Sequence, residues 1–200
     1  MLMTARKHYP PEKAEPLMCV PACLNMIFRR RGLEPIPQKL IAVELGLVVP
    51  LRLQNSFPLA CISEDSRDWG VHPQDERTSL KGFFDRQRIP LEEKFYLSSQ
   101  IPTSFGYAEF LSLALESGND VIVGYDYATV FRSGGNVGHV SLICDVDSAK
   151  DVAWILDPES ADEGPMHVLL RDLVAGVRTQ RDGFWIIGPH EAVRQCAEVI

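Results

Sequence analysis

Apolar and polar positions divide the chain into a helical first part and a sheet-forming second part. Apolar side chains recur at three- and four-residue spacing over residues 19–31, which predicts a helix with one buried stripe. Gly32, after three arginines, indicates the C-terminal end of that helix. Further helices are predicted over 37–46, opened by proline and closed by glycine, over 78–88, capped by Thr78, and over 104–117, followed by Gly118.

Runs rich in β-branched and apolar residues predict the strands. They cover residues 92–97, 121–127, 138–144, 152–157 and 184–187, the last of which is expected to close the sheet. Residues 166–173 fit a short helix or strand, and residues 131–136 form a glycine-rich turn. The long irregular stretch 47–74 is interpreted either as a flap over a cleft or as an element that its pattern does not resolve. We therefore expect one α+β domain over residues 1–200, with N-terminal helices packed on an antiparallel β-sheet.

Composition narrows the functional classes. With 46% hydrophobic residues, 200 residues are enough for one domain with a proper core. A net charge of −7 and a pI near 5.2 argue against a nucleic-acid partner or an anionic membrane surface. The first thirteen residues lack the apolar core of a signal peptide, and no stretch is long enough to span a bilayer, so a cytoplasmic location is expected.

Five cysteines are scattered along the chain, which fits free thiols in a reducing compartment. Cys19 and Cys23 lie one helical turn apart, but no second ligand pair accompanies them, so neither a metal nor another cofactor is expected. Cys23 belongs to the apolar stripe and Cys144 to the apolar side of its strand, and both are interpreted as core residues.

Cys19 differs from the other cysteines because it stands where the first helix begins. Unpaired N–H groups and the helix dipole favour negative charge there, so the sequence predicts a thiol biased toward the reactive thiolate. The run Arg29–Arg31 at the other end is interpreted as offsetting the C-terminal dipole, with an anion site as the alternative.

A base for such a thiol is predicted far downstream. If residues 138–144 and 152–157 form a hairpin whose tight turn is centred on Ser148, Cys144 opposes Val152 and His139 directly opposes Asp157. A one-residue slip would put the imidazole and the carboxylate on opposite faces of the sheet. In this register Cys19 is the expected nucleophile, His139 the base and Asp157 the carboxylate that orients it.

These residues resemble those of the C39-type cysteine peptidases, a branch of the papain-like peptidases. In that family a cysteine opens the first long helix in a pattern similar to Asp-Cys-Gly-x-Ala-Cys-Leu-x-Met-Val, and residues 18–27 match it at both cysteines, alanine, leucine and methionine. The family's histidine opens a strand, as in Gly138-His139-Val140, and its aspartate closes the next one, as in Leu156-Asp157-Pro158. The resemblance implies a papain-like fold and thiol-dependent peptidase activity.

Two departures from the family pattern concern the groups beside the nucleophile. The family usually carries a glutamine ahead of the cysteine to hold the oxyanion, whereas Glu12, Lys13 and Glu15 occupy this stretch here. Lys13 and Glu15 are therefore candidate oxyanion or substrate residues, as is Val20, which stands where the family has glycine and is expected to narrow the cleft.

The sequence thus predicts an enzyme, a cysteine peptidase that cleaves a peptide or a small amide through Cys19, His139 and Asp157. Two alternatives stay open. An acyltransferase would share the first half-reaction and pass the acyl group to an amine. An inactive peptide-binding relative would keep the cleft without turnover, and an unneutralised glutamate beside Cys19 would favour it. The sequence makes no prediction of the oligomeric state.

Overall fold

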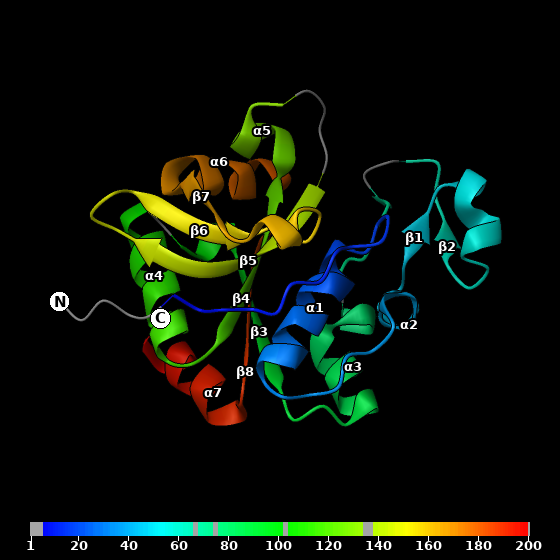
Figure 1. The fold of residues 1–200 in the computed structure, drawn as a ribbon, viewed down its shortest axis with the longest axis horizontal. Coiled ribbons are helices and arrows are strands. Elements are labelled where there is room, and N and C mark those ends of the chain that lie inside the picture. Colours follow the sequence, from blue (N-terminus) through cyan, green and yellow to red (C-terminus); the bar gives the residue numbers. More distant parts are fainter. Residues whose placement is uncertain (1–5, 66–67, 74–75, 102–103, 134–137, 200) are drawn as a thin grey trace.

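A computed structural model describes residues 6–65, 68–73, 76–101, 104–133 and 138–199 (Figure 1). Within these ranges the α-helices are α1 (Cys19–Arg30), α2 (Gln38–Glu44), α3 (Leu80–Gln87), α4 (Ser104–Glu116), α5 (Tyr127–Phe131), α6 (Leu170–Gln180) and α7 (His190–Val199). The strands are β1 (Val48–Val49), β2 (Cys61–Ile62), β3 (Glu92–Leu97), β4 (Asp120–Asp126), β5 (Gly138–Asp147), β6 (Val152–Leu156), β7 (Met166–Leu169) and β8 (Gly183–Gly188).

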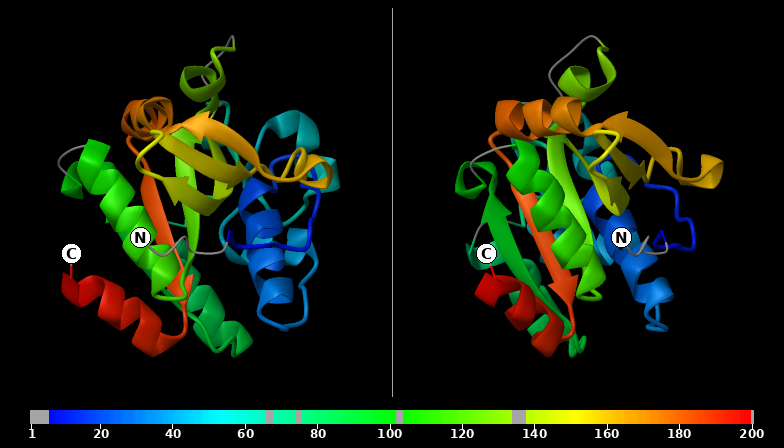
Figure 2. Two further views of the ribbon diagram at one scale, coloured as in Figure 1. Left: turned by 60° about the vertical axis from the view of Figure 1, so that its left-hand side comes forward. Right: turned by 90° about the vertical axis from the view of Figure 1, so that its left-hand side faces the viewer.

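A six-stranded sheet in the order β3-β8-β4-β5-β6-β7 forms the centre of the fold, and every neighbouring pair is antiparallel. Helices α4, α6 and α7 lie on one face of the sheet and α1, α2 and α3 on the opposite face (Figure 2). The side chains of each group pack into an apolar cluster on their own face. The α+β class and the antiparallel sheet are as the sequence predicts. The position of residues 184–187 is not, because β8 lies inside the sheet, where Phe184 and Trp185 fill opposite faces.

Helix α1 begins at the cysteine that the sequence singled out. A turn in which the Met18 N–H donates to the Glu15 carbonyl brings the chain into the helix, and Met18 itself is fully buried. At the other end Gly32 adopts a positive φ of 70°, which glycine tolerates without strain. The predicted start and end of this helix are therefore confirmed.

The arginines that end α1 have acidic partners, which answers the question of an anion site. Arg30 and Arg31 both pair with the fully buried Asp120 of β4, at 2.7 and 2.6 Å, and Arg29 pairs with Glu12 at 2.5 Å. These contacts fix the end of α1 against the sheet, so the run serves as a structural anchor.

The segment that sequence patterns left irregular is a small unit beside α2. Strands β1 and β2 pair in parallel, and the 3₁₀ helix Leu51–Ser56 lies between them. Its apolar cluster consists of Met18, Ala42, Leu47, Val49 and Phe57. Because Met18 precedes Cys19, this unit packs directly against the start of α1.

The remaining local predictions have different outcomes. Helix α3 is capped by Ser79, whose hydroxyl accepts from the Gly82 N–H, and not by Thr78. Residues 166–173 contain a strand followed by the start of a helix, and most of the glycine-rich turn, residues 134–137, lies outside the described residues. In the parts of the chain that are described, every helix is too short or too polar to cross a bilayer.

The hairpin of β5 and β6 has a different register from the one predicted. Val152 opposes Asp147 rather than Cys144, and a bulge at Cys144 shifts the pairing so that Leu142 opposes Leu156. Continuing that register sets Asp157 opposite Ser141, diagonal to His139 and on the same face. Without the bulge Asp157 would oppose Leu142 and point to the other face. The bulge thus keeps His139 and Asp157 on the same face of the sheet, whereas a hairpin with this turn and no bulge would put them on opposite faces.

Candidate functional site

His139 and Asp157 form a buried pair at the end of the sheet. The His139 Nε2 lies 3.0 Å from the Asp157 Oδ1, and the two residues are 7% and 3% exposed. A carboxylate only accepts hydrogen bonds, so with Asp157 ionised Nε2 carries the proton and Nδ1 is the basic nitrogen. The ring is also held by Tyr125 and Tyr127, whose planes meet it nearly edge-on at centroid distances of 5.7 and 5.4 Å.

Cys19 lies against the first residues of the same strand. Backbone N–H groups of Val20 and Val140 interact with its sulfur, and Val140 directly follows His139. Burial nevertheless raises the pKa of the Cys19 thiol to about 11, because desolvation outweighs the lowering by these N–H groups. The predicted bias toward thiolate is therefore outweighed: the N–H groups at the helix start lower the pKa of the thiol as expected, but burial has the larger effect.

The thiol and the imidazole approach β5 from its two faces. Val140 belongs to the apolar cluster that α1 covers, whereas His139 packs beside Tyr125, which belongs to the cluster on the other face. Among the described residues no hydrogen bond joins the Cys19 sulfur to the His139 ring. The Val140 N–H that acts on the Cys19 sulfur belongs to the residue directly after His139, so the two side chains are linked through the peptide bond between His139 and Val140.

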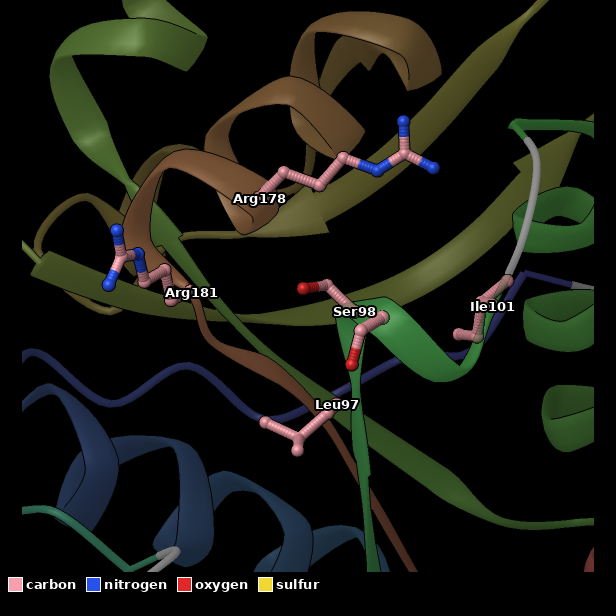
Figure 3. Close-up of a pocket in the computed structure, with 6 residues that line it drawn as sticks. Leu97, Ser98, Ile101, Arg178 and Arg181 are labelled. Atoms are coloured by element: carbon pink, nitrogen blue, oxygen red, sulfur yellow. The ribbon is translucent and has the colours of Figure 1, made fainter.

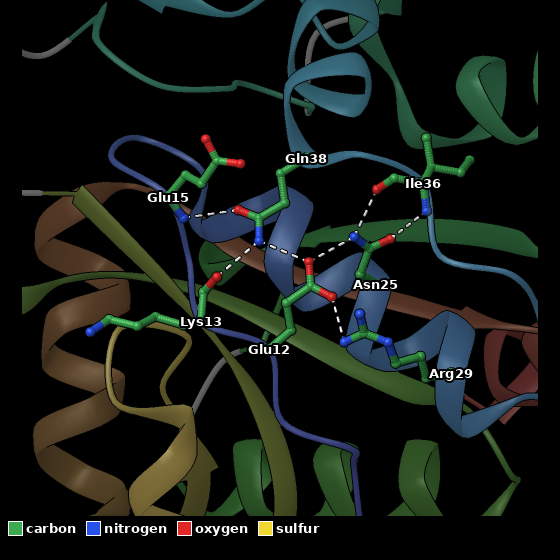
Figure 4. Close-up of polar contacts among 7 residues, drawn as sticks. All are labelled: Glu12, Lys13, Glu15, Asn25, Arg29, Ile36 and Gln38. Carbon is green, nitrogen blue, oxygen red and sulfur yellow. Dashed lines mark hydrogen bonds and ion pairs between the residues drawn. The ribbon is translucent and has the colours of Figure 1, made fainter.

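The segment ahead of Cys19 is held by a network around Gln38 (Figure 4). The Gln38 side chain donates to the Lys13 carbonyl and accepts from the Glu15 N–H, both at 2.9 Å. It also donates to Glu12, which accepts from Asn25 as well. Sequence reasoning missed Gln38 and Asn25, because their role depends on contacts across three segments.

This network determines the positions of the predicted oxyanion candidates. Glu12 is neutralised by Arg29, which lies at the far end of α1 from Cys19. The Glu15 carboxylate is exposed and lies 3.6 Å from the Lys39 ammonium. Lys13 is exposed and its side chain extends away from Gln38 (Figure 4). Glu12 and Glu15 therefore both have cationic neighbours, and neither leaves an unneutralised charge beside the Cys19 thiol.

The other residues predicted around the nucleophile are in the core. Val20 is 3% exposed and packs in the apolar cluster that α1 covers, so its side chain does not border an open cleft. Cys23 and Cys144 are buried in the same cluster, as the sequence predicts.

Glu159 is a neighbour of the pair that the sequence analysis did not single out. Its backbone N–H donates to the Asp157 Oδ1 at 2.8 Å, the oxygen that also holds His139. Its side chain is exposed, and its charge acts on both Cys19 and Tyr127. The sequence could have indicated this contact, because Glu159 follows Asp157 by only two residues and an aspartate often accepts from the N–H two residues on.

Asp182 is a second missed carboxyl group near this end of the sheet. Its carboxylate covers Gly124 so closely that a Cβ there would lie 2.2 Å from Oδ2, and Gly124 pairs directly with Val140. Burial raises the pKa of Asp182 to about 6, although the Gly183 N–H and the charge of His72 act in the opposite direction. Sequence gave no signal for it, because its environment follows from the close approach of two strands and a helix end.

A pocket of about 490 Å³ lies where β3 ends near the C-terminus of α6 (Figure 3). It is lined by Leu97, Ser98, Ser99, Ile101, Arg178 and Arg181. The two guanidinium groups point in different directions, so they do not converge on one anion (Figure 3). Cys19, His139 and Asp157 do not line this pocket.

Within the described residues no group of three or more His, Cys, Asp and Glu side chains is arranged to hold a metal ion. A scan against protein-family models and a search of curated proteins both give no match to the chain.

Proposed function

We propose that the protein is a thiol-dependent acyl-transfer enzyme, a cysteine peptidase that cleaves a peptide or a small amide. The observation that carries this proposal is the buried hydrogen bond between His139 and Asp157, on the strand whose next N–H group contacts the Cys19 sulfur. The start of α1 at Cys19 and the resemblance to C39-type peptidases support it further. A papain-like fold is part of the same proposal.

A raised thiol pKa requires a base that acts during the reaction. As the substrate carbonyl approaches, His139 Nδ1 takes the thiol proton while the sulfur forms a bond to the carbonyl carbon. The C–N bond then breaks, and the imidazolium returns the proton to the leaving amine. Water, deprotonated by the same imidazole, attacks the thioester and releases the carboxylic acid and the Cys19 thiol.

The negative oxygen of the tetrahedral intermediate needs donors that are already in place. The first turn of α1 offers the N–H groups of Cys19 and Val20, which have no backbone acceptor within the described residues and interact with the Cys19 sulfur before substrate binds. Pro21 has no N–H, and the Ala22 N–H is already bonded to Met18. The helix start, in this proposal, takes the part that a glutamine side chain plays in the family pattern.

The first experiment measures acylation of the thiol without a known substrate. p-Nitrophenyl acetate is mixed with the protein, the release of p-nitrophenol is followed, and intact mass spectrometry locates the acetyl group. We expect a burst with acetylation at Cys19, and His139→Ala lowers its rate roughly 100- to 10,000-fold, since general-base catalysis contributes that much. Asp157→Asn lowers the rate because the imidazole loses the carboxylate that orients it.

The matched control is Cys61→Ser, which removes an exposed thiol and leaves the burst unchanged. Equal acetylation of Cys19 in the native protein and in His139→Ala would contradict the proposal. Adding a primary amine during turnover separates the two enzymatic alternatives, since an acyltransferase forms the amide in preference to acetate. A protein that binds peptides but never acylates Cys19 is the inactive alternative, and the charge of Glu159 near the thiol is the observation that favours it.

A further inference from the structure

The loop after Asp157 is fixed rigidly against the candidate site. The Glu159 N–H donates to Asp157 Oδ1, and the Pro158 carbonyl accepts from the Ala14 N–H at 2.8 Å. The first bond ties Glu159 to the carboxylate that holds His139, and the second ties the loop to the segment ahead of Cys19. Glu159 therefore stands at the rim of the site between two segments that also position the candidate groups.

The charge of Glu159 is not compensated locally. Its side chain is exposed, and within the described ranges its carboxylate forms no ion pair. On the facing segment, the Glu15 carboxylate lies 3.6 Å from the Lys39 ammonium, and Lys13 is exposed. The Glu159 charge acts on the Cys19 thiol and on Tyr127, which packs against the His139 ring: it adds to the raised pKa of Cys19 after the larger effect of burial, and to that of Tyr127 after burial and Asp157.

We propose that Glu159 is a specificity-determining residue that selects a substrate with a cationic group, such as a lysine or arginine side chain or a free amine, beside the scissile carbonyl. The part of this inference that concerns cleaved substrates rests on the proposed function. The carboxylate also disfavours an anionic substrate, because a like charge would enter a partly desolvated site. The net charge of −7 attracts cationic peptides in the same direction.

The test compares charged reagents at the Cys19 thiol and needs no turnover. Three methanethiosulfonates, with trimethylammonium-ethyl, methyl and sulfonato-ethyl groups, react at pH 9 and low salt. In each the thiolate attacks the reagent sulfur, a mixed disulfide forms and methanesulfinate leaves. We expect the cation-to-anion rate ratio at Cys19 to exceed that at the exposed Cys61 roughly 5- to 30-fold, as Coulomb's law gives for unit charges several ångströms apart near a surface.

In Glu159→Gln we expect the cation-to-anion rate ratio at Cys19 to fall close to the ratio at Cys61. We expect 1 M salt to lower the ratio in the native protein in the same way, because salt screens the carboxylate. Glu163→Gln is the matched control, because it removes an exposed carboxylate from the same loop and leaves the ratio unchanged. Equal ratios at the two cysteines, no change in Glu159→Gln, or a Cys19 closed to all three reagents would overturn the inference.

A second arm uses turnover. Two peptides that differ only by lysine or glutamate beside the scissile bond are compared, and the lysine peptide is cleaved faster by the native protein but not by Glu159→Gln. If no peptide is cleaved while the reagent ratio behaves as expected, the proposed function fails and the charge selectivity of the thiol site stands.

Discussion

At the scale of single residues, burial decides how the titratable groups near Cys19 behave. The helix start was expected to stabilise a thiolate, yet burial raises the pKa of that thiol to about 11. Asp182 shows the same effect on a carboxyl group, since burial raises its pKa to about 6. Sequence can place a residue at a helix start or after a strand, but the desolvation that dominates its pKa comes from residues distant in the chain.

The raised pKa of Asp182 predicts a dependence of stability on pH. Between about pH 4 and 6 the folded state binds a proton that the unfolded state has already lost, so stability falls as pH rises through this window. The contribution is at most about 3 kcal/mol, because each pKa unit corresponds to about 1.4 kcal/mol.

Urea unfolding of the native protein and of Asp182→Asn at pH 4, 5, 6 and 7 measures this. The difference in unfolding free energy between the two proteins should change across the window and level off above pH 7. A difference that stays constant from pH 4 to 7 would show that Asp182 titrates normally.

At the scale of elements, local signals fix the start and end of α1, and long-range contacts fix its placement against the sheet. The capping signals of this helix are local, and the sequence predicts them correctly. Its placement depends on Asp120, which is fully buried and accepts from Tyr9, Arg30 and Arg31. No pattern along the chain connects the arginines with an aspartate ninety residues away.

Removing the charge of Asp120 should therefore destabilise the protein strongly. Asp120→Asn leaves two arginines without their buried carboxylate, and such a loss costs about 3 kcal/mol or more of unfolding free energy. Asp85→Asn is the control, since Asp85 pairs with Lys81 on the surface, where water screens the charges and the loss of the pair changes stability little. Urea unfolding gives both values, and equal effects would contradict the anchoring role.

At the scale of the whole molecule, two large apolar clusters lie on the two faces of the sheet, and a smaller third cluster lies under the β1–β2 unit. Because the third cluster includes Met18, this unit supports the residue that precedes Cys19. The unit can loosen locally without unfolding the sheet, since few of its side chains reach the main clusters.

Two phenylalanine substitutions separate local from global stability. Phe57→Ala is expected to raise hydrogen exchange over residues 47–62 and to slow acylation of Cys19, with little change in the global unfolding midpoint. Phe184→Ala, in the cluster beneath α4 and α6, costs about 3–5 kcal/mol and raises exchange throughout the sheet. A global loss in Phe57→Ala as large as in Phe184→Ala would contradict the separation.

The sequence by itself determined the parts that local chemistry specifies. Periodicity and capping residues located α1 with Cys19 at its start, and β-branched runs located the strand that carries His139 and the strand that Asp157 follows. Tertiary structure decided the rest: the bulge at Cys144 that keeps the pair on one face, the inner place of β8, the raised pKa of the Cys19 thiol, and Glu159 beside Asp157. The physical reason is range, since helix and strand signals act over a few residues, whereas register, burial and charge proximity arise only when distant segments pack together.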